Sequence, residues 1–324
     1  MHRMTTMPTV DTEILLATYN GARYLPALLL SLDAQTDQDW RLVARDDGSS
    51  DETVALLSDW GMRHPERFLL LRNDTDRRGA SANFSALLEQ STSRYFLPCD
   101  QDDVWVDDKV ARLRTAMRAA EAEVSDETPI IVHTDLKVVG ENLEPLADSM
   151  WALANLRLPP KDRPWGLMTV QNVVTGCAMM GNAALLRVAL PVPDDCKMHD
   201  WWLAMAASFL GRVVPISEPG VLYRQHGANT LGADRWSFWQ DMGKAVSFLA
   251  GDRRDIGREF TLTRRQAAAF LRQMRPHLDP DHIAFLETFG TIEDMTVLQR
   301  RKFYRHHDMR LKGMVRNTGL WFLT

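Results

Sequence analysis

Three carboxylates occur within residues 100–103, Asp-Gln-Asp-Asp, directly after the apolar run at residues 95–99. Like charges this close repel one another unless a cation lies among them. Oxygen ligands suit a hard divalent cation, Mg²⁺ or Mn²⁺, which typically shares its coordination shell with a diphosphate. An acidic turn can instead cap the next helix, but Asp107 is already placed to do so. We therefore predict a divalent metal site at Asp100 and Asp102.

A second acidic pair, Asp46-Asp47, stands before Gly48. Taken alone, this sequence is more simply explained as a turn, because aspartate and glycine favour turn conformations. If the strands before Asp46 and Asp100 are neighbours, however, both carboxylates line one crevice. A carboxylate there can accept hydrogen bonds from the N–H of a pyrimidine base or from ribose hydroxyls.

The sequence His199-Asp200-Trp201-Trp202 combines an acid with two adjacent tryptophans. Two neighbouring tryptophans on one helix cannot both face the core, so at least one is expected to line a cleft and stack on a sugar ring. Asp200 would then be a general base for a sugar hydroxyl. The alternative is that Asp200 is a helix N-cap and that both tryptophans are core residues. The sequence alone leaves both open.

His226 is a polar residue at the end of a predicted strand. A lone histidine is usually structural, but a third metal ligand from a distant segment is expected here, and histidine suits Mn²⁺. Other chemistries lack their signatures: the chain has no G-x-G-x-x-G after its first strand, no complete P-loop motif and no G-x-S-x-G. These absences disfavour a dinucleotide oxidoreductase, a P-loop ATPase and an α/β-hydrolase.

Alternating strand and helix patterns must position these residues. The predicted strands are residues 10–17, 40–44, 68–71 and 95–99, and the predicted helices are 24–34, 53–60 and one that Ser81 caps. This alternation predicts a mostly parallel sheet with right-handed crossovers, whose ligands bind beyond the carboxyl ends of the strands. Residues 18–21, 46–48 and 100–103 each follow such a strand, which favours a single site.

The second half is less regular. Further strands are predicted at residues 130–135, 173–180 and 221–226, with a helix from Asp200 to Leu210. Strand patterns stop near residue 234, and helical patterns with many arginines follow. We expect a catalytic domain over residues 8–233 and a helical C-terminal region over 234–324.

Composition limits the possible partners and location. The 324-residue chain has a formal net charge of −5, which argues against nucleic-acid binding. Its three cysteines are far apart and form no C-x-x-C pair, so neither a disulfide framework nor a zinc site is indicated. No apolar signal core and no run of about 18 apolar residues is present, so a cytoplasmic location is expected.

Four segments together resemble the family 2 glycosyltransferases, which are inverting enzymes with an A-type nucleotide-sugar fold. They are residues 17–21 (Ala-Thr-Tyr-Asn-Gly), 45–51 (Arg-Asp-Asp-Gly-Ser-Ser-Asp), 100–105 (Asp-Gln-Asp-Asp-Val-Trp) and 199–202 (His-Asp-Trp-Trp). The resemblance covers roughly residues 10–232. Residues 79 and 83–84, 175–177, 201–202 and 223–227 are more specifically similar to bacterial rhamnosyltransferases, which build O-antigen or other cell-surface polysaccharides from dTDP-rhamnose.

The resemblance implies an α/β, Rossmann-like nucleotide-diphospho-sugar transferase fold with a helical C-terminal extension. It implies Asp200 as the base that deprotonates the acceptor, and Mg²⁺ or Mn²⁺ held by Asp100, Asp102 and His226. The residues it places around the nucleotide-sugar donor, with the tryptophans shaping the donor and acceptor pocket, are Thr18, Tyr19, Asn20, Asp46, Asp47, Asn83, Asp100, Gln101, Trp105, Trp201 and Trp202.

The expected function is therefore metal-dependent, inverting transfer of a sugar, rhamnose from dTDP-rhamnose by resemblance, onto a hydroxyl of a growing cell-surface glycan. One alternative is the same fold with a UDP-hexose donor. Another is a non-catalytic nucleotide-sugar-binding subunit of a polysaccharide assembly complex, although such a subunit would not need the complete set of acids.

The basic segment at residues 300–316, followed by Trp321 and Phe322, suits peripheral contact with the anionic inner leaflet and a lipid-linked acceptor. The alternative is a solvated helix that packs on the main domain or forms an oligomer contact.

Overall fold

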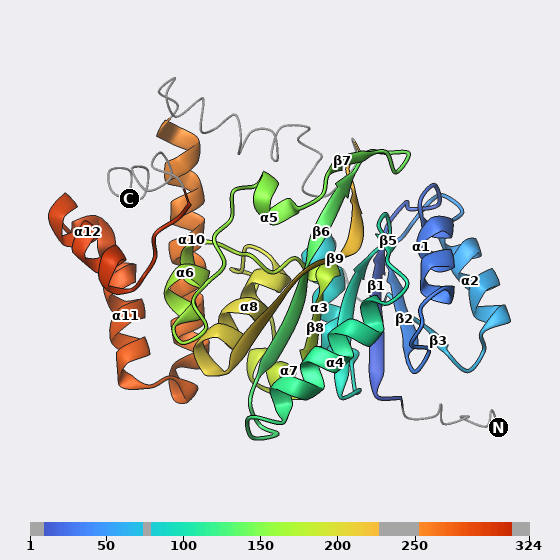
Figure 1. Cartoon of the computed structure of the whole chain (residues 1–324), viewed down its shortest axis with the longest axis horizontal. Helices are drawn as coiled ribbons and strands as arrows, with labels where there is room; N and C mark the ends of the chain where they lie inside the picture. Colours follow the sequence, from blue (N-terminus) through green and yellow to red (C-terminus); the bar gives the residue numbers. More distant parts are fainter. Residues whose placement is uncertain (1–9, 74–78, 227–252, 313–324) are drawn as a thin grey trace.

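The computed structural model describes residues 10–73, 79–226 and 253–312, with side chains from residue 258 onward in the last range. A mixed β-sheet runs through the centre, and helices cover both of its faces (Figure 1). Its strand order is β3-β2-β1-β4-β8-β6-β9-β5, and β7 pairs with β6 outside this path. The predicted α/β architecture is confirmed.

The first half is the parallel sheet that the sequence predicts. Its strands are β1 (Thr12–Thr18), β2 (Arg41–Asp46), β3 (Phe68–Leu71) and β4 (Tyr95–Asp100), connected by α1 (Leu25–Asp33), α2 (Thr53–Arg63) and α3 (Ala80–Gln90). Thr18 pairs with Asp46, and Ala17 pairs with Asp100. The polar sequences that follow these three strands therefore lie at one edge of the sheet.

The second half mixes strand directions. β8 (Met179–Asn182) is antiparallel to both β4 and β6 (Ile130–Val139), and β9 (Arg212–Arg224) is parallel to β6. The short strands β5 (Val104–Trp105) and β7 (Pro145–Ala147) pair antiparallel with β9 and β6. The prediction of a mostly parallel sheet therefore holds only for its first half.

Two predicted strands differ from the observed ones. Within the stretch 173–180, residues Gly176–Ala178 form the 3₁₀ turn η1, and the strand begins only at Met179. The strand predicted at 221–226 overlaps the end of the longer β9, which stops at Arg224 and leaves residues 225 and 226 outside the strand. Pro215 and Pro219 interrupt the strand pattern in its first part, because proline cannot donate a backbone hydrogen bond to a neighbouring strand.

Five further helices lie in this part of the chain: α4 (Lys109–Glu121), α5 (Met150–Leu153), α6 (Pro164–Val170), α7 (Ala183–Ala189) and α8 (His199–Leu210). Two predicted caps are wrong. The N-cap residue of α4 is Asp108, whose side chain makes no capping bond and pairs with Arg112 at 2.5 Å instead. Helix α3 begins after Gly79, at a positive φ of 94° that glycine tolerates, so Ser81 lies inside the helix.

The hydrophobic core has one part on each face of the sheet, because successive strand side chains alternate in direction. Ile14 and Leu16 of β1 contribute to the part that also contains Trp60 of α2. Leu15 contributes to the other part, together with Phe84 of α3. This second part continues through α8 into the C-terminal helices.

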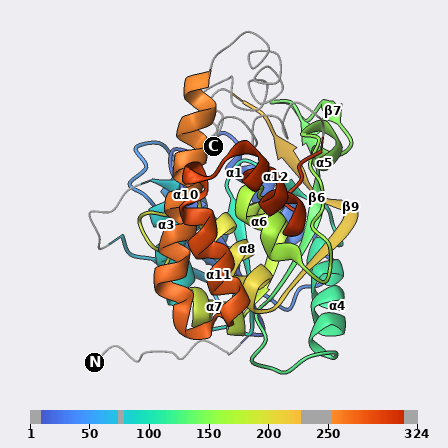
Figure 2. The same cartoon turned by 90° about the vertical axis from the view of Figure 1, so that its left-hand side faces the viewer.

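The C-terminal region is helical, as predicted. It contains α10 (Arg253–Met274), α11 (Pro280–Gly290) and α12 (Val297–His306), with the short 3₁₀ helices η2 (Arg275–His277) and η3 (Ile292–Asp294) between them. These helices lie at one end of the molecule beside α6 and α8, opposite α2 (Figures 1 and 2). The expected domain boundary at residue 233 lies outside the described residues. No helix in the described ranges is long and apolar enough to cross a bilayer.

Candidate active site

The loops after β1 and β2 are joined by the carboxylate of Asp46. The Thr18 hydroxyl donates to its Oδ1 at 2.9 Å, and the backbone N–H groups of Gly48 and Ser49 donate to its Oδ2 at 2.9 and 2.7 Å. Asp46 therefore closes a turn, as the simpler explanation of Asp-Asp-Gly requires. The turn also fixes Thr18 and Asp46 side by side at the sheet edge.

Gln101 binds the loop after β1 through its amide. Its Nε2 donates to the backbone O of Tyr19 at 2.8 Å, and its Oε1 accepts from the backbone N of Tyr19 at 2.9 Å. A Cβ on Gly21 would come within 2.1 Å of Gln101 Oε1, so this approach requires glycine. The side chain of Tyr19 remains 56 % exposed. Gln101 thus positions the loop, while the Tyr19 ring is available to stack on a base.

Three other residues expected around the donor use their polar atoms on the protein itself. Asn20 accepts from the backbone N of Ser50 at 2.8 Å, and Asp47 accepts from the backbone N of Gly79 at 2.7 Å. Asn83 is buried, with its amide between two groups of Arg45: it accepts from Nη1 at 2.9 Å and donates to the backbone O at 3.1 Å. The expectation of direct donor contact is corrected for Asp47 and Asn83, because both are buried and support the loops.

Asp102 and His226 meet, with 2.9 Å between Oδ2 and Nε2. Adjacent ligands of an octahedral cation at about 2.1 Å lie roughly 3 Å apart, so this pair has the spacing of two metal ligands. Asp100 and Asp102 are both partly exposed. Two carboxylates and an imidazole fit Mg²⁺ or Mn²⁺, and the imidazole favours Mn²⁺.

Among the described residues, Asp100, Asp103 and Cys177 also bring possible ligand atoms within 4.8 Å of one another. Asp103 and Cys177 are buried, and Asp103 Oδ1 accepts the backbone N–H of Arg224 at 3.0 Å. Burial raises the pKa of the Cys177 thiol well above its ordinary value, so the thiol stays protonated. Among the described residues, the predicted set of Asp100, Asp102 and His226 does not come within this distance as a group; only Asp102 and His226 are in contact.

Two carboxyl groups of residues 100–103 have raised pKa values. Burial raises the pKa of Asp100 to about 7, and the charges of Asp102 and Asp200 act in the same direction. Burial also raises the pKa of Asp103. A divalent cation held by these carboxylates would offset the repulsion between them.

Tyr24 and Arg224 hold His226 and Asp102, and of these two only Arg224 lies in a segment that the sequence analysis singled out, residues 223–227. The ring of Tyr24 stacks on that of His226 at a centroid distance of 4.3 Å, and the Tyr24 hydroxyl donates to Glu141 at 2.7 Å. Arg224 donates from Nε to the backbone O of Asp102 at 2.7 Å. Tyr24 and Glu141 are distant from His226 in sequence, so no local motif connects them to it.

Asp200 lies in the first turn of α8, after the N-cap Met198, and it is not the cap itself. Its Oδ2 accepts from the backbone N of Gly176 at 3.0 Å, and its Oδ1 accepts from Asn172 Nδ2 at 3.3 Å. Burial raises the pKa of Asp200 to about 6, partly offset by the Gly176 N–H. A carboxylate with this pKa is ionised at neutral pH and readily accepts a proton. Asn172 had no sequence signal, and Gly176 was named only as part of the segment 175–177, without this role.

The three tryptophans expected at the pocket, Trp105, Trp201 and Trp202, differ in how deeply they are buried. Trp202 is fully buried, with Nε1 donating to the backbone O of Ala189 at 2.8 Å, and Trp105 is 2 % exposed. The expectation that these two shape the pocket is corrected, because both rings are core residues. Trp201 is half-buried; its Nε1 donates to the backbone O of Met168 at 2.7 Å, and the Lys197 ammonium lies 4.5 Å from its ring centroid.

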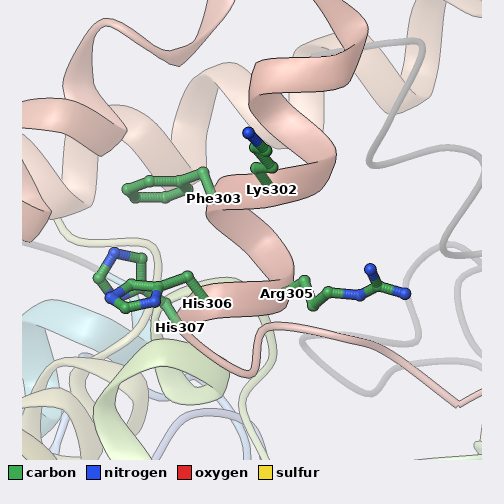
Figure 3. A pocket seen from close by; sticks show the side chains of 5 residues that line it. All are labelled: Lys302, Phe303, Arg305, His306 and His307. Carbon is green, nitrogen blue, oxygen red and sulfur yellow. The ribbon is translucent and has the colours of Figure 1, made fainter.

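Two hollows, of about 510 and 560 Å³, lie at the C-terminal helices rather than at the acidic edge. Figure 3 shows the smaller, with Phe303, His306 and His307 of α12 and the turn that follows it on one side, and Lys302 and Arg305 projecting elsewhere. No acid from the edge of the sheet lines either hollow. We place the candidate site at Asp100, Asp102 and Asp200, because carboxylates can bind a metal ion or accept a proton.

Residues 13–183 match the glycosyl transferase family 2 model, and the chain belongs to this family. The chain is 24 % identical over 244 residues to the protein Rv1520 of Mycobacterium tuberculosis, covering 72 % of this chain and 65 % of that relative, which is less than two thirds of its length. It is 32 % identical over 98 residues to dTDP-rhamnosyl transferase RfbG of Shigella flexneri, covering 29 % of this chain and 34 % of RfbG.

A similar short match, 30 % identity over 98 residues, involves the Escherichia coli enzyme WfgD, a UDP-Glc:alpha-D-GlcNAc-diphosphoundecaprenol beta-1,3-glucosyltransferase; it covers 30 % of this chain and 37 % of WfgD. Among solved structures, S. aureus TarS with UDP-GlcNAc has a TM-score of 0.56 at 16 % identity, covering 92 % of this chain and 88 % of TarS. The mannosyltransferase PcManGT of Pyrobaculum calidifontis, with GDP-Man and Mn²⁺, has a TM-score of 0.53 at 16 % identity. The match covers 93 % of this chain and 84 % of PcManGT. Both support the predicted A-type fold.

Proposed function

We propose that this protein is an inverting glycosyltransferase that moves a sugar from a nucleoside diphosphate to an acceptor hydroxyl, assisted by Mg²⁺ or Mn²⁺. The observation that carries the proposal is the 2.9 Å contact between Asp102 and His226, which follow β4 and β9. The electrostatic effect of Asp200 on Asp100 supports placing a base near these acids.

Each group has a role in a single displacement. The Asp200 carboxylate takes the proton of the acceptor hydroxyl, whose oxygen attacks the anomeric carbon. The bond from that carbon to the diphosphate oxygen breaks, and the configuration inverts. A cation held by Asp100, Asp102 and His226 would neutralise the charge that develops on the departing diphosphate. Tyr19 stacks on the base, beside Thr18 and Asp46.

The proposed donor is dTDP-L-rhamnose. Its support is the short match to RfbG, a protein named as a dTDP-rhamnosyl transferase, together with the sequence features shared with rhamnosyltransferases. A UDP-hexose is the second candidate, because the match to WfgD is of similar length and identity and WfgD is named for UDP-glucose. Donor choice depends on a few pocket side chains, so the two candidates share one mechanism.

The proposed acceptor is a hydroxyl of a growing cell-surface glycan carried on a lipid at the inner face of the plasma membrane. WfgD, whose name includes a diphosphoundecaprenol acceptor, supports a lipid carrier. Helix α12 offers a matching surface: Leu298, Arg301, Lys302 and Arg305 are exposed at the i, i+3, i+4, i+7 spacing of one helix face. Cations around an exposed leucine suit an anionic bilayer surface.

The test is donor binding and turnover with dTDP-rhamnose, UDP-glucose, UDP-galactose and GDP-mannose, each with Mg²⁺, Mn²⁺ or EDTA. Metal-dependent selectivity for dTDP-rhamnose is the expected result. Selectivity for a UDP-hexose would keep the mechanism and replace the donor. Binding without any turnover of a donor, with acceptor glycans present, would contradict the enzymatic proposal and favour a nucleotide-sugar-binding subunit.

A further inference from the structure

Lys109 is the first residue of α4, and its side chain is fully buried. Complete burial of lysine is rare, because removing an ammonium from water is costly unless partners receive it. Here Nζ donates to the backbone O of Cys177 at 2.5 Å and lies 3.0 Å from the centroid of the Trp105 ring. The transfer mechanism above does not use this group.

The side chain of Lys109 connects two parts of the site. Its backbone begins the helix that follows the acidic residues 100–103, and its charge faces Asp100 and Asp103. Its ammonium holds the carbonyl of Cys177 in the turn η1. The residue before Cys177 is Gly176, whose N–H donates to Oδ2 of Asp200 at 3.0 Å. One buried lysine, whose pKa is lowered to about 7 by burial, thus links the loop of acids to the turn that contacts Asp200.

The turn η1 packs closely against the start of α8. A Cβ on Gly176 would lie 3.0 Å from Nε2 of His199 and 3.5 Å from Cβ of Asp200. Such close packing leaves little room for the turn to move independently of the helix. A displacement of the Cys177 carbonyl would therefore shift the Gly176 N–H relative to the Asp200 carboxylate.

We propose that Lys109 is a positioning residue that sets the placement of Asp200 relative to Asp100 and Asp102, through the Cys177 carbonyl and the Gly176 N–H. Because it is fully buried, Lys109 acts through other residues and does not touch substrate. The inference rests on the proposed function, in which Asp200 is the general base.

The electrostatics of Asp200 provide a distinctive readout. Burial raises its pKa to about 6, and the Gly176 N–H lowers it. The titratable groups around it are Asp100 at the end of β4, Cys196 in the loop before α8 and His199 on α8 itself. Loss of the Gly176 hydrogen bond would raise the pKa of Asp200 further, which a general loss of stability would not do.

The first test is Lys109→Met, which nearly keeps the length of the side chain and removes the hydrogen bond from Nζ to the Cys177 carbonyl. We expect kcat to fall about 10²-fold with a nearly unchanged KM for the donor, because a displaced base affects the transition state more than donor binding. The acid limb of the kcat–pH profile should move up by roughly half to one pH unit. Arg112→Met on the same helix is the matched control, and its kcat and the pH of its acid limb should equal those of the wild type.

The second test disturbs the other end of the link with Gly176→Ala, both alone and with Lys109→Met. A shared link predicts that each single variant moves the acid limb and that the double variant moves it by less than the sum. The inference would be overturned if the two shifts of the acid limb were additive. It would also be overturned if the acid limb of Lys109→Met lay at the same pH as in the wild type. If Lys109→Met does not fold, an unmoved limb in a folded, donor-binding Gly176→Ala would overturn it.

A measurement without turnover separates this inference from the proposed function. The carboxyl carbon of Asp200 can be titrated by ¹³C NMR, with Asp200→Asn identifying its signal. A raised Asp200 pKa in Lys109→Met supports the link even if no sugar is transferred, and an unchanged pKa contradicts it. Absence of sugar transfer by the wild-type protein would contradict the proposed function alone.

Discussion

Asp102 and His226 are 124 positions apart in the chain, yet their side chains meet at 2.9 Å. Asp102 follows β4 in the parallel half of the sheet, whereas His226 follows β9 in the mixed half. Their contact therefore depends on correct assembly of both halves. Tyr24, stacked on His226, adds a third segment to this point.

This contact predicts how metal affinity responds to substitution. His226→Gln and Asp102→Ala should each weaken Mn²⁺ binding by about tenfold or more, because each removes a ligand. Isothermal titration with Mn²⁺ would measure it. The matched control is His282→Gln, since His282 lies 3.2 Å from the carboxylate of Asp279 in a similar pair away from the site. Wild-type affinity in His226→Gln would exclude His226 as a ligand.

The raised pKa of Asp200 predicts the pH dependence of transfer. A general base acts only when deprotonated, so kcat should fall about tenfold per pH unit below pH 6 and level off above it. Asp200→Asn should bind donor and lose about 10²–10⁴-fold in kcat. The exposed Asp195, in the loop before α8, provides the control variant Asp195→Asn. Near-normal turnover by Asp200→Asn would remove Asp200 from this role.

Two buried histidines predict a loss of stability in acid. Burial lowers the pKa of His133 and of His199 to about 3, and their ring nitrogens have no hydrogen-bond partner among the described residues. Between pH 3 and about 6.5 the unfolded chain binds more protons at these positions than the folded protein does. The free energy of unfolding should therefore fall as the pH falls through this window, by up to about 1.4 kcal/mol per pH unit for each histidine.

Urea unfolding at several pH values would measure this slope. His133→Gln should reduce the slope of the unfolding free energy against pH by the equivalent of about one bound proton. A substitution of the exposed His277 should leave this slope unchanged. Equal slopes for His133→Gln and the wild type would mean that His133 can be protonated in the folded protein.

The exposed face of α12 predicts binding to anionic membranes. Replacing Arg301, Lys302 and Arg305 by glutamine should weaken binding to phosphatidylglycerol-containing vesicles roughly 100-fold, at about 1 kcal/mol per charge. The control replaces three exposed arginines elsewhere: Arg63, Arg118 and Arg187. Sedimentation with vesicles would measure both. Equal loss in the two triple variants would point to net charge alone, and no loss in either would refute the membrane contact.

The sequence predicted which strand ends come together at the sheet edge better than it predicted the residues that support them. Strand periodicity located the ends of β1, β2 and β4, and parallel strands must bring such ends together. Trp202 was uncertain because the spacing of two tryptophans does not say which of them faces the core. The first part of β9 was missed because two prolines interrupt its pattern. Tyr24, Asn172 and Lys109 depend on contacts between distant segments, which no local pattern records.

The C-terminal helices share one core with α8. The Trp202 ring lies 5.3 Å from that of Phe270 on α10, and Gln266 of α10 accepts the backbone N–H of Lys197, just before α8. The helix that carries Asp200 and the C-terminal helices that pack on it therefore all lie beyond the 13–183 stretch that matches the family model. A truncation at residue 233 would strip the apolar cover from this helix. The C-terminal helices therefore belong to the same folding unit as the helix that carries Asp200.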